Sequence, residues 1–399
     1  MDMAKPIIRF KGYQDDWEQR KFSEFVENVA VKNREGLDLE CYAVTNDRGF
    51  ISQKEAHDDF GYMADVDTKA YNIVPPNSFA YNPARINVGS IGYYTGTENV
   101  IVSSLYEVFQ TADYVDDRFL WHWFKSEHFP KWIERLQEGS VRLYFYYDKL
   151  IQCEMKMPSL GEQKKIGAYF DSLDHLITLH QRKCDETKRL KKYMLQKMFP
   201  QNGKKVPEIR FSGFTDDWEQ RKLGEISDSY SGGTPTAGKS EYYGGDIPFI
   251  RSAEVNSDST ELFLTDEGLK NSSAKMVNKG DILYALYGAT SGETGLARLD
   301  GAINQAILDI KPHENYDAAF IMQWLRKSKE NIIGTYLQGG QGNLSGSIVT
   351  SLMIDCPNHE EQKLIGEYFQ NLDHLITLHQ RELENLQNIK KFMLEKMFV

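Results

Sequence analysis

The sequence has few cysteines for its length, and none is spaced for a metal site or a disulfide framework. The four cysteines, at positions 41, 153, 184 and 356, lie far apart in 399 residues, and no C-x-x-C pair occurs. Structural zinc sites need closely spaced thiolate or imidazole ligands, and small secreted domains need paired cysteines. The spacing therefore argues against both classes and predicts reduced thiols.

Long apolar runs are also missing. No stretch approaches the roughly 20 consecutive apolar residues that a membrane-spanning helix needs. The opening residues, MDMAKP, are not followed by an apolar signal core. We therefore expect a cytoplasmic protein without membrane contact. A length of 399 residues is sufficient for two or three domains with sizeable cores.

An excess of positive charge is the third absence. The formal net charge is −11, from 47 basic and 58 acidic residues, which argues against a simple nucleic-acid binder. The charge is uneven, because residues 158–200 hold 9 basic and 5 acidic side chains while residues 1–157 and 201–356 are each acidic. Binding to a polyanion would require locally clustered cations or a basic partner.

The chain is a tandem duplication. Residues 9–22 read RFKGYQDDWEQRKF, and residues 210–223 read RFSGFTDDWEQRKL. The stretch LDHLITLHQR occurs within residues 170–199 and again within residues 369–398. Each copy therefore has a matched opening, a divergent middle and a matched closing segment.

The two closing segments have the 3,4 spacing of apolar residues that is typical of a coiled-coil seam. We expect the helix-helix seam to contain Phe170, Leu173, Ile177, Phe369, Leu372, Ile376, Leu383 and Leu386. Lys191 and Lys390 also recur at seam positions, where a solvated or snorkelling stem is the default expectation. Thirty helical residues span about 45 Å. Two such helices in one chain are expected to pack against each other.

Prolines mark where each globular middle ends. Pro158 and Pro357 occupy equivalent places, each shortly before a charged first turn. The predicted order is a globular domain over 1–157, a long helix over 158–200, a second globular domain over 201–356 and a second long helix over 357–399.

The globular middles are predicted to mix strands and helices. Strands are expected over 77–81, 100–109, 280–285 and 302–310, and a helix over 118–136 has a counterpart over 318–325. The scaffold is expected to be shared while the loops differ. Loops are where differences in binding usually reside.

One stretch matches the phosphate-binding pattern G-x-x-x-x-G-K-[ST], from Gly233 to Ser240. That pattern binds a nucleotide only between a buried strand and a helix that begins at the lysine. The preceding residues 226–231 are too polar for such a strand, and Gly244, Gly245 and Pro248 interrupt the expected helix. A loop is therefore favoured over a nucleotide site.

Two further patterns imitate catalytic motifs weakly. Asp148 with Glu154 and Lys156 resembles a nuclease metal motif, but these residues are closer together than that arrangement usually allows. Residues 74–79 have paired prolines without the polar residue that an amino-methyltransferase motif requires, and no glycine-rich cofactor fingerprint occurs. We expect a protein that is not itself an enzyme.

The features taken together resemble the DNA-specificity subunit of type I restriction-modification systems. They are the paired openings Pro6…Trp17 and Pro207…Trp218, the Gly-Gly-Thr-Pro loop at 232–235 and the repeated LDHLITLHQR helix. The resemblance implies an α+β fold with internal pseudo-two-fold symmetry. Two target-recognition domains would each read one half of a split site in double-stranded DNA. The long helices would form an antiparallel coiled coil that sets the spacing between the half-sites.

The resemblance also implies partners. Two methyltransferase subunits would dock on the helices, and endonuclease/translocase subunits would join that core. No cofactor is expected on this chain, whereas S-adenosylmethionine, ATP and Mg²⁺ are expected on the partner subunits. The rival interpretations are a nucleotide-hydrolysing enzyme and a coiled-coil scaffold that does not contact DNA.

The resemblance implies that the Gly-Gly-Thr-Pro segment is a loop of a recognition domain, and side-chain chemistry then suggests candidate DNA contacts in both domains. Arginine can bind guanine and asparagine can bind adenine through two hydrogen bonds, while hydroxyls and lysine suit phosphates. The candidates are Arg48, Tyr81, Asn82, Arg85 and Ser90 in the first domain, and Thr234, Lys239, Ser240, Tyr242, Arg251, Tyr287, Ser291, Asn304 and Gln305 in the second. Asn82 precedes a proline and is equally suited to a turn. Asn304 and Gln305 could instead satisfy a neighbouring loop.

Overall fold

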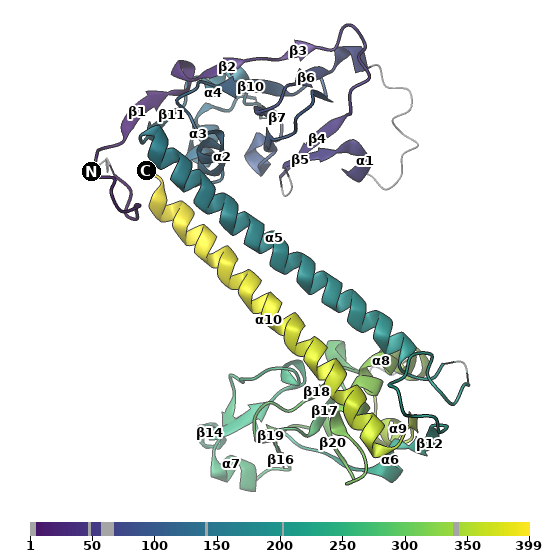
Figure 1. The fold of residues 1–399 in the computed structure, drawn as a ribbon. Coiled ribbons are helices and arrows are strands. Elements are labelled where there is room, and N and C mark those ends of the chain that lie inside the picture. The colour runs from purple at the N-terminus through teal and green to yellow at the C-terminus, as the bar shows by residue number, and fades with distance from the viewer. Residues whose placement is uncertain (1–4, 47–48, 57–67, 140–142, 202, 338–342) are drawn as a thin grey trace. The chain divides into compact units, whose positions relative to one another are not determined.

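The structure is a computed structural model that describes residues 5–46, 49–56, 68–139, 143–201, 203–337 and 343–399 (Figure 1). Contacts within the chain divide it into two compact units. Unit 1 comprises Met1–His180 and Arg381–Val399, and unit 2 comprises Gln181–Gln380. Each unit therefore holds one globular middle together with a part of both long helices.

Unit 1 is built around a four-stranded antiparallel sheet with the order β2-β10-β7-β8. These strands are β2 (Val26–Asn28), β10 (Glu107–Thr111), β7 (Ser78–Tyr81) and β8 (Ile91–Tyr94). A second sheet contains β3 (Val31–Lys32), β6 (Asn72–Val74) and β9 (Val100–Val102), and β4 (Tyr42–Thr45) pairs with β5 (Gly49–Ser52). The short helix α1 (Gln53–Ala56) follows β5, and β1 (Glu18–Lys21) pairs with β11 (Glu154–Met157).

The central sheet of unit 1 is buried on both faces, because successive strand residues point to opposite sides. Phe79 and Tyr81 of β7 pack with helices α2 (Asp117–Phe124) and α3 (His128–Leu136). Ala80, between them, joins a separate apolar cluster with Val74 and Val100 of the second sheet. The period-two pattern thus places the helices on one face and the second sheet on the other.

Unit 2 repeats this framework. Its central antiparallel sheet has the order β13-β20-β17-β18, from β13 (Ser227–Ser231), β20 (Ile307–Pro312), β17 (Ile282–Ala285) and β18 (Thr294–Leu296). Its second sheet has the order β15-β14-β19-β16, from β15 (Phe263–Leu264), β14 (Tyr243–Ile250), β19 (Gly301–Ile303) and β16 (Lys275–Val277). The remaining elements are β12 (Glu219–Lys222) paired with β21 (Met353–Cys356), and α6 (Leu223–Ile226), α7 (Asp266–Lys270), α8 (Ala318–Tyr336) and α9 (Gly346–Thr350).

Three predicted elements are interrupted. The predicted strand over 302–310 is broken at 304–306, because the Asn304 side chain accepts a hydrogen bond from the Ala306 amide and closes a turn. The predicted strand over 100–109 is broken at the equivalent place, 103–106. The predicted helix over 118–136 divides into α2 and α3, where the Ser126 hydroxyl donates to the Trp123 carbonyl and accepts from the His128 amide.

The long helices are α5 (Leu160–Lys197) and α10 (His359–Met397), of 38 and 39 residues. In unit 1, Phe170 of α5 stacks on Phe398, just beyond α10, and Asp174 pairs with Lys390. In unit 2, Phe199, just beyond α5, stacks on Phe369 of α10, and Lys191 pairs with Asp373. Within each unit a higher number on α5 matches a lower number on α10, so the two segments run antiparallel.

The predicted seam residues vary in burial. Phe170, Leu173, Phe369, Leu372 and Leu386 are buried, and Ile177, Ile376 and Leu383 are half-buried. Lys191 and Lys390 are not the solvated or snorkelling stems that the sequence favours, because the charged end of each is mostly buried in an ion pair with the other helix.

A buried ion pair fixes the start of each long helix to its unit. In unit 1, Arg9 donates two hydrogen bonds of 2.7 and 2.8 Å to the fully buried carboxylate of Glu162. The next residue, Gln163, accepts a hydrogen bond from the backbone amide of Asp116, which caps α2. Unit 2 repeats both contacts with Arg210, Glu361, Gln362 and Asp317. The matched openings of the two copies therefore anchor the helices.

Candidate nucleic-acid interface

In unit 1, three loops meet beyond the ends of the central strands. Residues 82–90 follow β7, residues 103–106 join β9 to β10, and residues 143–146 precede α4 (Tyr147–Leu150). The Phe145 amide donates to the Pro83 carbonyl at 3.1 Å, and the Asn82 amide donates to the Ser90 carbonyl at 3.0 Å. We call these three segments cluster 1.

Cluster 1 surrounds an open hollow of about 560 Å³. Its lining contains Asn82, Pro83, Ala84, Arg85, Asn87, Leu105, Leu143, Tyr144 and Tyr146. The Tyr144 and Tyr146 rings are stacked, with their centroids 5.4 Å apart and their planes within 2° of each other. Among the described lining residues, Arg85 is the one charged side chain. The hollow thus combines aromatic surface, amide groups and a cation.

Unit 2 brings the equivalent loops together. The Leu286 amide, after β17, donates to the Ala306 carbonyl at 2.8 Å, and the Leu344 amide donates to the Leu286 carbonyl at 2.9 Å. The Thr234 hydroxyl donates to the Gln305 side-chain oxygen at 2.8 Å. We call residues 232–236, 286–291, 304–306 and 343–345 cluster 2. In unit 1 the loop after β7 therefore meets the turn between β9 and β10, and in unit 2 the loop after β17 meets the turn between β19 and β20.

The glycines of the Gly-Gly-Thr-Pro loop are required by close packing. A Cβ atom on Gly232 would lie 1.8 Å from the Ile303 carbonyl oxygen, and one on Gly233 would lie 2.1 Å from the Ser273 hydroxyl. Gly238, by contrast, has nothing within 4 Å of such an atom. The paired glycines thus let the loop approach strand β19 and position Thr234 beside Gln305.

Several sequence-predicted contacts lie on the clusters. Arg85, Thr234 and Gln305 are exposed, and Asn82, Tyr287 and Asn304 are half-buried. The side-chain oxygens of Asn82 and Asn304 accept hydrogen bonds from the amides of Ala84 and Ala306, so each also holds a turn. The positions of these two asparagines are therefore compatible both with a role in stabilising a turn and with contact to DNA.

Four sequence-predicted contacts lie inside the protein. Tyr81 is fully buried and packs on the ring of Phe109 of β10, and burial raises its pKa well above its ordinary value. Ser90 and Ser291 are buried and donate to the carbonyls of Val44 and Leu286. Tyr242 is also buried. Each of these four residues exposes 6% of its surface or less, so they lie outside the candidate interface in this conformation.

The remaining predicted residues lie outside the clusters. Lys239 donates to the Tyr242 hydroxyl at 2.9 Å, and Ser240 begins a single turn of three residues that leads into β14. This single 3-10 turn, and no α-helix, follows Lys239 before β14 begins at Tyr243, so the geometry of a phosphate-binding loop is not present in this described segment. Arg251 is bound by the carboxylates of Glu254 and Glu261. Arg48 lies outside the described residues.

Sequence reasoning missed Leu105, Asn87, Tyr144 and Tyr146. The signal for the tyrosines was present in the run LYFYYD at 143–148, where alternation buries Phe145 and leaves Tyr144 half-buried and Tyr146 exposed. Nothing in the sequence alone indicated that this run would meet the loop after β7.

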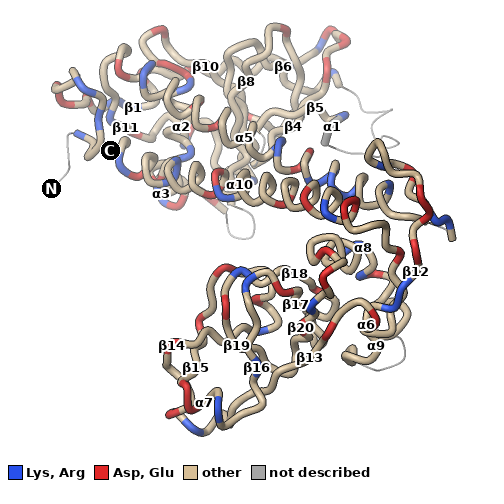
Figure 2. Tube along the Cα trace, turned by 60° about the horizontal axis from the view of Figure 1, so that its bottom comes forward, with Lys and Arg blue, Asp and Glu red and all other residues tan. Residues whose placement is uncertain are grey.

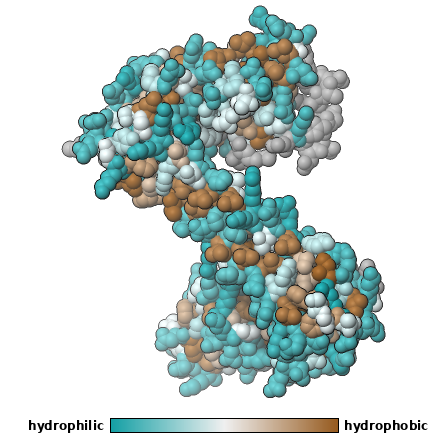
Figure 3. All heavy atoms as spheres, in the orientation of Figure 1, coloured by the Kyte–Doolittle hydropathy of each residue, from teal (hydrophilic) through white to brown (hydrophobic). Residues whose placement is uncertain are grey.

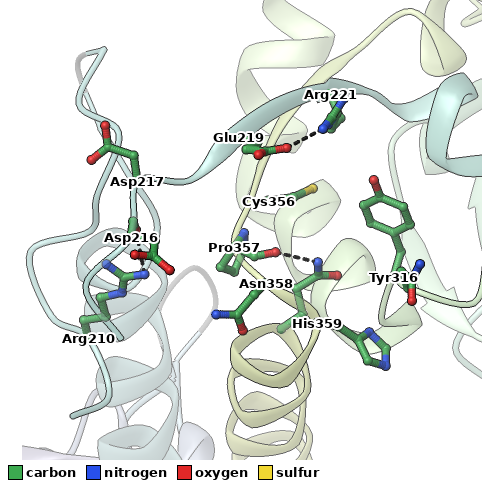
Figure 4. A pocket seen from close by; sticks show the side chains of 12 residues that line it. Arg210, Asp216, Asp217, Glu219, Arg221, Tyr316, Cys356, Pro357, Asn358 and His359 are labelled. Carbon is green, nitrogen blue, oxygen red and sulfur yellow. Dashed lines mark hydrogen bonds and ion pairs between the residues drawn. The ribbon is translucent and has the colours of Figure 1, made fainter. Parts of the chain in front are cut away.

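A second hollow, of about 380 Å³, lies beside the start of α10 in unit 2 (Figure 4). Its walls combine Arg210 and Arg221 with Asp216, Asp217 and Glu219. Arg221 is paired with Glu219, and Arg210 with Glu361. These carboxylates make the hollow unsuitable for phosphate groups, so cluster 2 is the better candidate for contact with a polyanion in unit 2.

The long helices carry charge of both signs and exposed apolar side chains. Lys and Arg are interspersed with Asp and Glu along them (Figure 2). Leu176, Ile389 and Phe392 are exposed in unit 1, and Leu190, Tyr193, Leu375 and Leu378 are exposed in unit 2. Apolar residues gather over the helical parts of both units (Figure 3). Three of these positions recur in both copies at an offset of 199 residues: Leu176 and Leu375, Leu190 and Ile389, and Tyr193 and Phe392.

Among the described helices, none combines the length and the apolar character needed to cross a membrane. Within the described part of the chain, no group of three or more His, Cys, Asp or Glu side chains is placed to hold a metal ion.

Comparison with known proteins identifies relatives across the chain. The MjaX specificity subunit of a putative type I restriction enzyme from Methanocaldococcus jannaschii is 22% identical over 94% of this chain and 91% of its own length. The MjaVIII specificity subunit of the same organism is 23% identical, with the same coverage. A crystal structure of a type I restriction-modification S subunit from M. genitalium matches 99% of both chains with a TM-score of 0.68 at 14% identity, which shows the shared fold.

The family model described as "Type I restriction modification DNA specificity domain" matches twice, at residues 14–189 and 215–388. The two matches cover most of the chain and coincide with its two copies. The chain therefore belongs to the family of type I restriction-modification DNA specificity proteins.

Proposed function

We propose that this chain is the DNA-recognition subunit of a type I restriction-modification complex, and that each unit reads one half of a bipartite site. The observation that carries the proposal is the pair of loop clusters on equivalent frameworks with different side chains. A duplicated framework lets two readers face two half-sites, as in a dimer, while each reader recognises a different sequence. The acidic total charge is compatible with DNA binding by the complex, because methyltransferase subunits would bind most of the phosphates.

The clusters supply different groups for contact with DNA. In cluster 1, Arg85 and Asn87 are exposed and can donate to base edges or phosphates. In cluster 2, Thr234 and Gln305 offer a hydroxyl and an amide. Lys239 and Ser240 remain candidates for phosphate contact beside cluster 2, since both are exposed.

Binding to duplexes that contain both half-sites tests this assignment. We expect Arg85→Ala to weaken binding by about 1–3 kcal/mol and to relax selectivity in one half-site, while Gln305→Ala relaxes the other. Binding should be measured at several salt concentrations with the methyltransferase subunits present, because phosphate contacts change the salt dependence. A coiled-coil scaffold that does not contact DNA would show no effect of either substitution on DNA affinity.

We further propose that the long helices set the distance between half-sites and dock two methyltransferase subunits. The recurrence of exposed apolar positions in both units supports two equivalent docking surfaces, since exposed apolar patches commonly mark protein interfaces. The joint substitution Leu375→Asp and Leu378→Asp should remove one methyltransferase of two, and light scattering on the purified complex would measure the stoichiometry. The control is Leu37→Asp, an exposed leucine outside the helices.

The catalytic chemistry would then belong to the partners. S-adenosylmethionine, ATP and Mg²⁺ would be bound by the methyltransferase and endonuclease/translocase subunits, and the complex would act in the cytoplasm. The test for this chain alone is equilibrium dialysis with each small molecule. Binding of ATP that Lys239→Ala abolishes would contradict the assignment.

A further inference from the structure

The two clusters differ in chemistry at the same point of the framework. Leu105, in the turn between β9 and β10, is 72% exposed, which is the largest exposure among the described large apolar residues. The corresponding turn of unit 2, between β19 and β20, presents Gln305 hydrogen-bonded to Thr234. Cluster 1 thus offers an aliphatic side chain where cluster 2 offers a hydrogen-bonding pair.

The apolar surface of cluster 1 is continuous with its hollow. Leu143 and Tyr146 are also exposed, and both line the hollow together with Leu105. The stacked rings of Tyr144 and Tyr146 form one wall. Exposed apolar side chains that gather around a concave surface mark a binding site.

The charge at this site favours a polyanion as the occupant. Arg85 lines the hollow, and none of its described lining residues is acidic. This local charge contrasts with the net charge of −11 of the whole chain. A peptide from a partner protein would use the apolar surface, but its binding would not require a positively charged hollow on an acidic chain. Among the groups on base edges in the major groove, the C5 methyl of thymine is the apolar one.

We propose that cluster 1 reads thymine in its half-site by apolar contact of Leu105, Leu143 and Tyr146 with the thymine methyl group. This inference rests on the proposed function of DNA recognition. Arg85 and Asn87, at the same hollow, contact a neighbouring base edge or phosphate. Unit 2 reads its half-site through hydrogen bonds. The two halves of one site are therefore recognised by different kinds of contact.

Duplexes in which deoxyuridine replaces thymidine test the proposal, because this change removes only the methyl group. The two half-sites are first defined by selecting bound duplexes from a random pool with the chain and its methyltransferase subunits. The half-site whose selectivity changes in Arg85→Ala belongs to unit 1. We expect each contacted methyl group to contribute about three- to fivefold in affinity, as one buried CH₂-sized group does. Deoxyuridine in the other half-site should leave the affinity unchanged.

Leu105→Ser provides the matched protein change. It should weaken binding to the thymine duplex and remove the difference between thymine and uracil. The control is Ile7→Ser, which changes a side chain that is 63% exposed and lies outside the hollow. Both variants should retain the thermal unfolding midpoint of the parent, since both side chains are exposed.

The outcomes separate the inference from the function on which it rests. Selective binding that does not respond to deoxyuridine, or a unit 1 half-site without thymine, would overturn the inference alone. Loss of methyltransferase association in Leu105→Ser would show that a protein occupies the hollow and would also overturn it. Failure of the complex to select any duplex would instead overturn the proposed function.

Discussion

Lys191 of α5 and Asp373 of α10 form an ion pair of 2.6 Å within unit 2, and the equivalent positions of unit 1 hold Lys390 and Asp174. Asp373 also accepts hydrogen bonds from Gln323 and Arg326 of α8. One carboxylate therefore joins both long helices to the globular part of unit 2. Because Lys191 is 13% exposed and Asp373 30%, solvent screens this group only in part.

Asp373→Ala should lower the free energy of unfolding of the chain by about 2–4 kcal/mol, because it leaves Lys191 and Arg326 partly buried without their partner. Urea denaturation monitored by tryptophan fluorescence measures the change. The control is Glu219→Ala, whose ion pair with Arg221 is largely exposed and screened by solvent, so this substitution is expected to change the urea midpoint little. Equal effects of the two substitutions would contradict the joining role of Asp373.

The Arg210 and Glu361 pair predicts that arginine and lysine are not interchangeable at the helix anchor. Arg210 donates two hydrogen bonds to a fully buried carboxylate, and lysine cannot reproduce this geometry. Arg210→Lys should therefore cost about 1–3 kcal/mol of stability. Lys205→Arg, at an exposed pair with Asp217, should change the urea midpoint little. If Arg210→Lys left the stability unchanged, a positive charge alone would be sufficient to hold Glu361.

Asp309 predicts a pH dependence of stability. Burial raises its pKa to about 6, with Lys311 at 3.6 Å acting in the opposite direction. A folded-state pKa above the unfolded value means that the folded state holds the proton more tightly, so stability falls as pH rises from about 4 to about 6. The equivalent residue of unit 1, by strand register, is the buried Val108.

Asp309→Val should remove this dependence and stabilise the chain above pH 6 by about 1–3 kcal/mol. Urea midpoints of variant and parent at pH 4, 5, 6 and 8 measure this contribution. The other carboxylates titrate in both proteins, so their effect cancels in the difference between the two midpoints. A difference that does not change with pH would contradict the account.

Two glycines of the same loop are expected to respond in opposite ways to alanine. Gly232→Ala should displace the Gly-Gly-Thr-Pro loop, because its Cβ would lie 1.8 Å from a backbone oxygen, and it should weaken unit 2 by more than about 2 kcal/mol. Gly238→Ala meets open space and should be neutral or slightly stabilising. Thermal unfolding and selectivity in the unit 2 half-site are the measurements. A larger effect of Gly238→Ala than of Gly232→Ala would restore the phosphate-loop interpretation, in which Gly238 is the critical residue.

The sequence was most informative where the two copies agree. The repeated opening and closing segments predicted two long helices that begin just after Pro158 and Pro357, and the structure begins them at Leu160 and His359. It was least informative inside the divergent middles. Tyr81 has the chemistry of a base contact, but the alternation of side chains along β7 directs its ring into the core. Side-chain type alone cannot distinguish the two faces of a strand that is buried on both sides.

Loop contacts were the other limit. Leu105, Arg85 and Tyr144 are distant in sequence and come together because three loops meet beyond the same strands. Such long-range pairing depends on sheet order, which local patterns do not determine. The division of each long helix between two units likewise arises from tertiary packing.

Mapping methylated bases in cells that carry this chain with its partner subunits tests the central claim most directly. Residues 22–150 would be exchanged for those of another family member, with the helices and unit 2 unchanged. The account predicts that one half of the methylated site changes while the other half and the spacing between them stay the same. A change in both halves, or in neither, would contradict the claim that each unit reads its own half-site.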